Sequence, residues 1–147
     1  MSPASLAEMP LRLFTRREYH AMADAGILTA EDRVELIKGR IVPMMPIGPW
    51  HISSSIRLDR LLQKLYGESA FISNGNPIGL GDDSEPQPDI TVLRFRDDYY
   101  ANGIPSPDDV ILAIEVADAS RAYDLGTKHD LYAEQGIAEF WVVDRKM

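Results

Sequence analysis

A carboxylate interrupts an otherwise apolar segment in the second half of the sequence. The segment VILAIEVA, residues 110–117, is apolar at every position except Glu115. Such a run predicts a buried strand, and an isolated buried carboxylate costs several kcal/mol unless it is paired, protonated or bound to a metal ion. The rest of the sequence should therefore supply a partner for Glu115.

Three further charged residues stand where they could form that partnership. Asp89 lies at the start of a predicted strand, and strand ends present side chains to clefts. Lys128 precedes Leu131 and Tyr132 by three and four residues, so it shares the helix face that should pack against the sheet. Glu35 lies between apolar neighbours in the segment RVELIKG. A lysine on a buried face needs an anion, and these carboxylates can provide one.

Carboxylates that converge with a lysine are typical of metal-dependent phosphodiester hydrolysis. Two or three carboxylates can hold Mg²⁺, which keeps several waters and is usually completed by substrate phosphates. The ion makes a bound water nucleophilic, while a lysine orients that water or offsets charge on the phosphoryl group. The sequence has no cysteine, which excludes thiolate zinc sites and cysteine nucleophiles. Asp89, Glu115, Glu35 and Lys128 are therefore a candidate site of this kind.

The predicted elements bring these residues to one sheet. Thr15 and Glu18 form a capping box for a helix over 16–24, and Lys38-Gly39 predicts the turn of a two-strand hairpin. Apolar positions at helical spacing predict a second helix that ends at Gly67. Strands are predicted within 70–80, 88–95, 110–117 and 138–144, and a further helix over 122–135.

The order of these elements predicts the fold class. From residue 50 the chain reads helix, strand, strand, strand, helix, strand, and a strand–helix–strand unit after a continuous apolar strand implies a parallel pair. We expect an α/β (α+β) fold with a central mixed β-sheet flanked by helices, preceded by the N-terminal helix and the β-hairpin. Residues 1–12 are expected to form a loose N-terminal arm, and residues 13–147 a single domain.

Composition narrows the classes of function. The 147 residues carry a formal net charge of −8, which argues against binding nucleic acid through charge alone. It does not exclude an enzyme whose clustered carboxylates are offset by a divalent cation. No apolar run approaches the roughly 18 residues of a membrane span. The N-terminus does not read as a secretory signal, so we expect no membrane partner and a cytoplasmic location.

Six segments in a fixed order resemble a known family. They lie within residues 13–144 and read RVELIKGRIV, PMMPIGPWH, QPDITVL, AIEVADAS, YDLGTK and LYAEQGIAEFWVVD. The set resembles the PD-(D/E)XK nuclease superfamily, and more specifically the Uma-two family of restriction endonuclease-like proteins. The resemblance implies a restriction endonuclease-like core and a Mg²⁺- or Mn²⁺-dependent endonuclease acting on nucleic acid, with DNA the expected substrate. It also implies C-terminal strands that this sequence lacks.

The resemblance assigns the metal ligands residue by residue. Asp89 and Glu115 match the two motif carboxylates and would be the core ligands. Glu35 matches a further characteristic position and would be a third acidic ligand, direct or through water. A main-chain carbonyl at Val116 or nearby would complete the shell.

The resemblance also assigns the remaining catalytic residues. The plain (D/E)XK lysine is replaced by Ala117, and Lys128 on the next helix takes its part, positioning the attacking water or stabilising the pentavalent phosphorus. His51 matches another characteristic position and would be auxiliary, by binding phosphate or assisting proton transfer. His20 and His129 are expected on helix surfaces without a role.

Plainer interpretations stand beside these assignments. Glu115 and Lys128 could be only a structural ion pair, and Lys128 could pair with Asp124 one turn earlier. The chain could be a non-catalytic interaction module that keeps a nuclease fold, or a metal-dependent hydrolase of small phosphorylated or nucleotide substrates. Exposed strand edges favour a homodimer. One basic helical stripe is a candidate for phosphate contacts, although a solvated face is the simpler interpretation: Arg57, Arg60 and Lys64.

Overall fold

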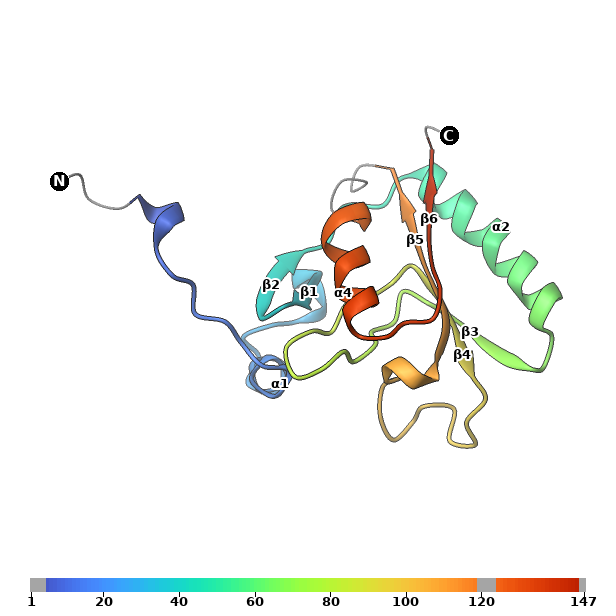
Figure 1. The fold of residues 1–147 in the computed structure, drawn as a ribbon, viewed down its shortest axis with the longest axis horizontal. Helices are drawn as coiled ribbons and strands as arrows, with labels where there is room; N and C mark the ends of the chain where they lie inside the picture. Colours follow the sequence, from blue (N-terminus) through green and yellow to red (C-terminus); the bar gives the residue numbers. More distant parts are fainter. Residues whose placement is uncertain (1–4, 119–123, 146–147) are drawn as a thin grey trace.

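The computed structural model describes residues 5–118 and 124–145, and its strands form two sheets. The smaller sheet is a hairpin of β1 (Val34–Ile37) and β2 (Arg40–Pro43). The larger sheet has the order β3-β4-β5-β6, with the bounds Ala70–Asn74, Ile90–Arg94, Val110–Ala117 and Phe140–Asp144. The α-helices of the described residues are α1 (Arg16–Asp24), α2 (Pro49–Tyr66) and α4 (His129–Glu134) (Figure 1).

The larger sheet is mixed, as the sequence predicts. β3 pairs with β4 and β4 with β5 in antiparallel directions, whereas β5 and β6 are parallel. The parallel pair needs a crossover connection, and α4 lies in that connection. β5 is buried at every position except Ile111, which is half-buried, so the expected buried strand is confirmed.

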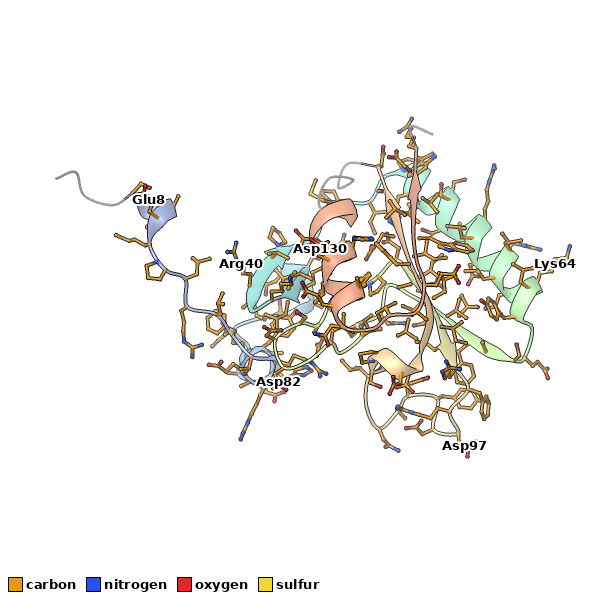
Figure 2. The ribbon with its side chains drawn as sticks, in the orientation of Figure 1. Glu8, Arg40, Lys64, Asp82, Asp97 and Asp130 are labelled. Carbon is orange, nitrogen blue, oxygen red and sulfur yellow. The ribbon has the colours of Figure 1, made fainter. Side chains whose placement is uncertain are left out.

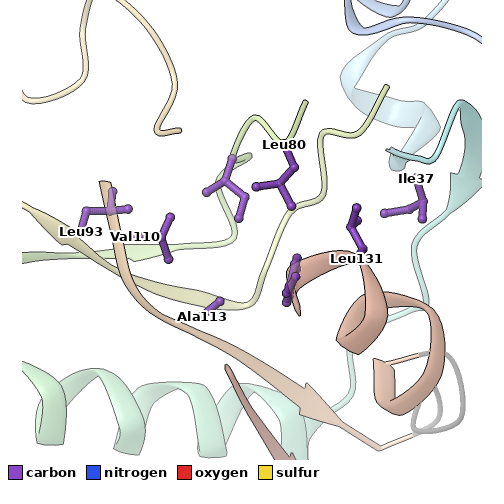
Figure 3. Packing of buried hydrophobic residues seen from close by; sticks show 8 residues of the cluster. Ile37, Leu80, Leu93, Val110, Ala113 and Leu131 are labelled. Atoms are coloured by element: carbon purple, nitrogen blue, oxygen red, sulfur yellow. The ribbon is translucent and has the colours of Figure 1, made fainter. Parts of the chain in front are cut away.

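The two faces of the larger sheet are covered by different elements. α2 lies on one side and α4 on the other (Figure 1). Leu112 and Ile114 of β5 belong to the apolar cluster that includes Leu62 of α2. Ala113 belongs to the opposite cluster, which joins Leu131 of α4 to the hairpin and the loop before β4 (Figure 3). Because strand side chains alternate between faces, position 115 falls on the face of α4.

The N-terminal helix and the hairpin form as their local sequences predict. The Thr15 hydroxyl accepts a hydrogen bond from the Glu18 N–H at 3.1 Å, and the Glu18 carboxylate accepts one from the Thr15 N–H at 3.1 Å. The hairpin turn has positive φ at Lys38 (48°) and Gly39 (82°), which suits the twist of the two strands. A Cβ on Gly39 would lie 2.7 Å from the Cβ of Leu13, so glycine is also required for this close approach.

The hairpin is fixed against the loop that leads into β4. The Glu85 N–H donates to the Leu36 carbonyl at 2.7 Å, and the Gly39 N–H donates to the Asp83 carbonyl at 2.7 Å. The Lys38 N–H donates to the Ser84 hydroxyl at 2.9 Å. These bonds hold the hairpin against residues 83–85 of the loop that leads into β4, and they thereby position the side chains of β1 relative to the larger sheet.

Two predicted elements differ in extent from those observed. The strand expected within 70–80 ends at Asn74, because Gly75 follows with a φ of 66° and Pro77 cannot donate a ladder hydrogen bond. The helix expected over 122–135 contains a π-helical turn over Asp124–Lys128, and its α-helical part is α4. Positions 122 and 123 of that expected helix lie outside the described residues.

Candidate active site

Asp89 and Glu115 lie side by side where β4 begins and β5 ends. The antiparallel register pairs Ile90 with Ile114, and one further step of the same register sets Asp89 opposite Glu115. The Asp89 Oδ2 atom accepts a hydrogen bond from the Val116 N–H at 2.6 Å. The carboxylates that the motif assigns are therefore neighbours across two adjacent strands.

Lys128 is the cation that the buried carboxylate of Glu115 requires. It is 3% exposed, and its Nζ lies 2.8 Å from Glu115 Oε1 and 3.0 Å from Glu35 Oε1. The Tyr132 hydroxyl donates to Glu115 Oε1 at 3.0 Å from one turn further along the chain. Sequence reasoning placed Tyr132 on the same helix face but missed its hydroxyl, for which the signal was a tyrosine four residues after a buried lysine.

Glu35 reaches this cluster from the hairpin. Its residue is 3% exposed, and its Oε1 also accepts a hydrogen bond from the Gln87 N–H at 3.0 Å. The alternative pairing of Lys128 with Asp124 concerns a side chain that lies outside the described residues. Lys128 thus joins two carboxylates that come from different sheets, one from β1 and one from β5.

His51 contacts Asp89 from the first turn of α2. Its Nε2 lies 2.9 Å from Asp89 Oδ1, and its Nδ1 lies 3.5 Å from the Ser55 hydroxyl. The helix begins with Pro49 after Gly48, since proline is preorganised for the first helical position and its missing N–H has no partner there. This start of the helix brings the imidazole to Asp89, the residue before β4.

All five predicted residues line one pocket of about 120 Å³. Sequence reasoning gave no role to Arg33 and Asp118, which line the same pocket and lie in the quoted segments RVELIKGRIV and AIEVADAS. The lining includes the carboxylates of residues 35, 89, 115 and 118 and the cations of residues 33 and 128, so with a neutral histidine its formal charge is −2. Such a pocket attracts a divalent cation.

The carboxylates of this pocket are suited to Mg²⁺, which needs few ligands from the protein. Within residues 5–118 and 124–145, no group of three or more His, Cys, Asp or Glu side chains is arranged to hold a metal ion. Mg²⁺ is usually bound by one or two carboxylates and completed by waters and substrate phosphates, so the adjacent Asp89 and Glu115 are sufficient in type and number. The Glu35 carboxylate contacts Lys128 and the Gln87 N–H.

The other charged residues singled out in the sequence lie away from this pocket. Arg57, Arg60 and Lys64 are exposed on α2, and Lys64 lies at the end of α2 distant from the hairpin (Figure 2). His129 is exposed as expected. His20 is also at the surface, but its Nε2 lies 2.6 Å from the carboxylate of a third buried glutamate, Glu85.

A second electrostatic feature borders the site on the side of α1. Burial, followed by the charges of Glu85 and Glu35, raises the pKa of the Tyr19 hydroxyl. The hydroxyl therefore stays protonated near neutral pH, and it donates to the Val34 carbonyl at 3.2 Å. This bond ties α1 to the first residue of β1.

The fold and the cluster of carboxylates with a lysine define a restriction endonuclease-like α/β domain. The chain matches the model of the Uma2 family, described as "Putative restriction endonuclease", over residues 16–147, and it belongs to that family. The resemblance seen in the sequence is thereby confirmed.

A solved structure has the same fold. It is the crystal structure of a protein from Anabaena variabilis described as "a putative nuclease belonging to DUF820", with a TM-score of 0.65 and 20% sequence identity over 84% of this chain and 73% of that one. No match was found among curated proteins. None of the helices in the described part of the chain is long and apolar enough to cross a membrane.

Proposed function

We propose that this chain is a Mg²⁺- or Mn²⁺-dependent endonuclease that hydrolyses phosphodiester bonds of nucleic acid, with DNA the expected substrate. The observation that carries the proposal is the pocket that gathers Asp89, Glu115, Glu35 and Lys128 and has a surplus of negative charge. The family description and the nuclease-like fold agree with this chemistry.

Asp89 and Glu115 would hold the ion, with the main-chain carbonyl of Val116 as a further ligand and Glu35 as a ligand directly or through water. When bound, the ion acts as a Lewis acid on the phosphate and lowers the pKa of a bound water. The Val116 N–H and the His51 imidazole both contact the Asp89 carboxylate, so they fix its orientation towards the pocket.

Lys128 would orient the attacking water and offset the charge that builds on the phosphoryl group. Glu35 and Glu115 keep the ammonium group at the pocket wall, and the Tyr132 hydroxyl fixes the Glu115 oxygen that contacts it. His51 lines the pocket and would assist proton transfer to or from the substrate.

The first test is Mn²⁺ and Mg²⁺ binding by calorimetry, because it needs no knowledge of the substrate. We expect binding to the wild type and its loss in Asp89→Asn, while Asp130→Asn, the same change at an exposed position of α4, retains it. Cleavage of oligonucleotides should follow the same pattern. A folded wild type that binds neither ion would contradict the proposal.

A non-catalytic module is the second candidate function. It is favoured by the protein's own hydrogen bonds and ion pairs, which already engage Glu35, Asp89 and Glu115, and by the net charge of −8. The calorimetry separates the two candidates, because a module with a degenerate site would not bind Mn²⁺ through Asp89. Parallel assays with mononucleotides test for a hydrolase of small substrates.

We also propose that the chain acts as a homodimer. β3 and β6 are the edge strands of the larger sheet, and Trp141 of β6 is 38% exposed. Exposed edges can pair with a second copy, and two active sites suit the cleavage of two strands. Sedimentation at micromolar concentration should give the mass of a dimer, and a monomer there would contradict this part of the proposal.

A further inference from the structure

The pocket that would bind a phosphodiester carries a surplus of negative charge on its walls. A phosphate group that enters is therefore repelled unless the proposed divalent ion or a cationic side chain faces it. Lys128 does not meet this need alone, because it is buried and its Nζ lies within 3.0 Å of two carboxylates. The remaining cationic side chain among the lining residues is Arg33.

The Arg33 side chain is placed to meet an incoming anion. The residue is exposed, and its guanidinium makes no hydrogen bond or ion pair with the described residues. Two other arginines pair with acidic side chains, Arg12 with Glu18 and Arg96 with Asp98. Arg33 thus differs from these in facing a pocket without an acidic partner of its own.

The backbone at Arg33 is of a kind that seldom carries a large side chain. Its φ is 46° and its ψ is 67°, which is the left-handed conformation that favours glycine. Two neighbouring features constrain this conformation. The next residue, Val34, begins β1, and the Arg33 carbonyl accepts a hydrogen bond from the Met44 N–H at 2.9 Å. A backbone conformation of this kind beside a candidate site supports a function of the Arg33 side chain.

Arg33 also lies where the pocket opens into a larger groove of about 610 Å³. Tyr19 and His20 of α1 also line this groove. Five residues line both cavities: Arg33, Met44, Ile47, Gln87 and Asp89. A polymer whose scissile phosphate lies at Asp89 could therefore continue into the groove past Arg33, whereas a single small substrate would occupy the pocket alone.

We propose that the Arg33 guanidinium binds the backbone phosphate next to the scissile one, on a polynucleotide strand that passes from the pocket into this groove. This inference rests on the proposed function and adds to it the direction of the substrate and the residue that offsets the pocket's charge. Arginine suits the task because its planar fork can donate two parallel hydrogen bonds to one phosphate.

The test measures oligonucleotide affinity in the full chain carrying Asp89→Asn, so that cleavage does not interfere. Arg33→Gly removes the guanidinium while placing glycine at the left-handed position, so thermal melting should show no loss of stability. Affinity for a labelled single strand should fall by about tenfold or more, as expected for a lost hydrogen bond between charged groups. The slope of log affinity against log salt should fall by about 0.7.

Two further variants make the measurement specific. Arg40→Ala removes an exposed arginine of the same hairpin that lines neither cavity, and it should leave affinity and salt slope unchanged (Figure 2). Arg33→Lys should fall between wild type and Arg33→Gly, because it keeps the charge and loses the fork.

Equal oligonucleotide affinity of the Arg33→Gly and Arg40→Ala proteins would overturn the inference. So would an Arg33→Gly variant that loses as much affinity for a mononucleotide as for an oligonucleotide. The proposed function fails differently, through an absence of metal binding at Asp89. If the wild type binds Mn²⁺ and Arg33 proves irrelevant, only this inference falls. If oligonucleotide binding depends on Arg33 while no metal binds, Arg33 is a polynucleotide contact and the proposed cleavage function falls.

Discussion

Two glutamates of this molecule are buried to nearly the same degree but have different surroundings. Glu115 is 3% exposed and Glu85 is 5% exposed. Glu85 accepts from Arg16 Nε at 3.1 Å and lies 2.6 Å from His20 Nε2, and both partners come from α1. Glu115 shares its lysine with Glu35.

The difference lies in the balance of charge. At Glu85 one carboxylate has two basic partners from α1, whose side chains are 31% and 54% exposed. This group attaches α1 to the loop before β4, and it leaves no surplus of negative charge. Around Lys128, the carboxylates of Glu35, Glu115 and Asp89 meet in one pocket. Burial of a carboxylate alone therefore does not indicate a site; a surplus of buried negative charge does.

The largest expected effect separates these two glutamates by function. Glu115→Gln should lower Mn²⁺ affinity and cleavage by more than about a hundredfold, the upper range for residues that only support a metal ligand. The fold should persist, because Glu35 still pairs with Lys128. Glu85→Gln should leave the Mn²⁺ affinity unchanged, because Glu85 does not line the pocket that holds Asp89 and Glu115. Calorimetry and oligonucleotide cleavage measure the two variants in parallel, and equal behaviour would remove the distinction.

The second effect concerns stability at the shared lysine. Lys128→Met leaves Glu35 and Glu115 buried without their cation, and it should cost about 3–5 kcal/mol of the free energy of unfolding. Lys38→Met is the matched control, since Lys38 pairs with Glu134 at 3.1 Å on the surface and such pairs contribute about 0–1 kcal/mol. Urea unfolding measures both, and a loss below 1 kcal/mol in Lys128→Met would show that the lysine is not needed for charge balance.

A smaller effect on stability is expected at the contact between α1 and the loop before β4. Glu85→Gln should lower the free energy of unfolding by about 1–2 kcal/mol, because its partners Arg16 and His20 remain partly hydrated when the charge is lost. Amide exchange should accelerate in α1 and not in β5. Uniform acceleration across both elements would mean that the contact supports the whole domain and not a local attachment.

The smallest expected effect is a local pH dependence of stability at Asp98, away from both glutamates. The hydrogen bond from Arg96 lowers the pKa of Asp98 to about 2. Because the folded pKa lies below the unfolded value of about 3.9, the stabilisation is present above pH 4 and is lost as the pH falls towards 2. The Tyr100 N–H donates to this carboxylate at 3.1 Å, so its amide resonance should report the transition, and Asp98→Asn should abolish it.

Much of the fold could be predicted from the sequence because neighbouring residues determine it. The capping box of Thr15 and Glu18 and the turn at Lys38-Gly39 depend on hydrogen bonds and dihedral angles within a few residues. The buried strand over 110–117 follows from its unbroken apolar run, and the parallel pairing follows from the helix that comes after it. The π-helical turn over Asp124–Lys128 was not predicted, because the helix was expected to continue through Gly126.

The candidate site was predicted as a set of residues but not as a set of contacts. The family resemblance and the residue types single out Asp89, Glu115, Glu35, Lys128 and His51, and the structure brings all five to one pocket. Their roles in metal binding and catalysis stay predictions.

Only the tertiary structure decided how these side chains pair. The position of Lys128 between Glu35 and Glu115 requires the hairpin to be fixed against the loop before β4, and no pattern within either segment encodes that contact. The Tyr132 hydroxyl and Arg33 could not be singled out for the same reason. Helices, strands and turns follow from residue types and periodicity among near neighbours. The charge balance in a pocket depends instead on groups far apart in the chain that packing brings together.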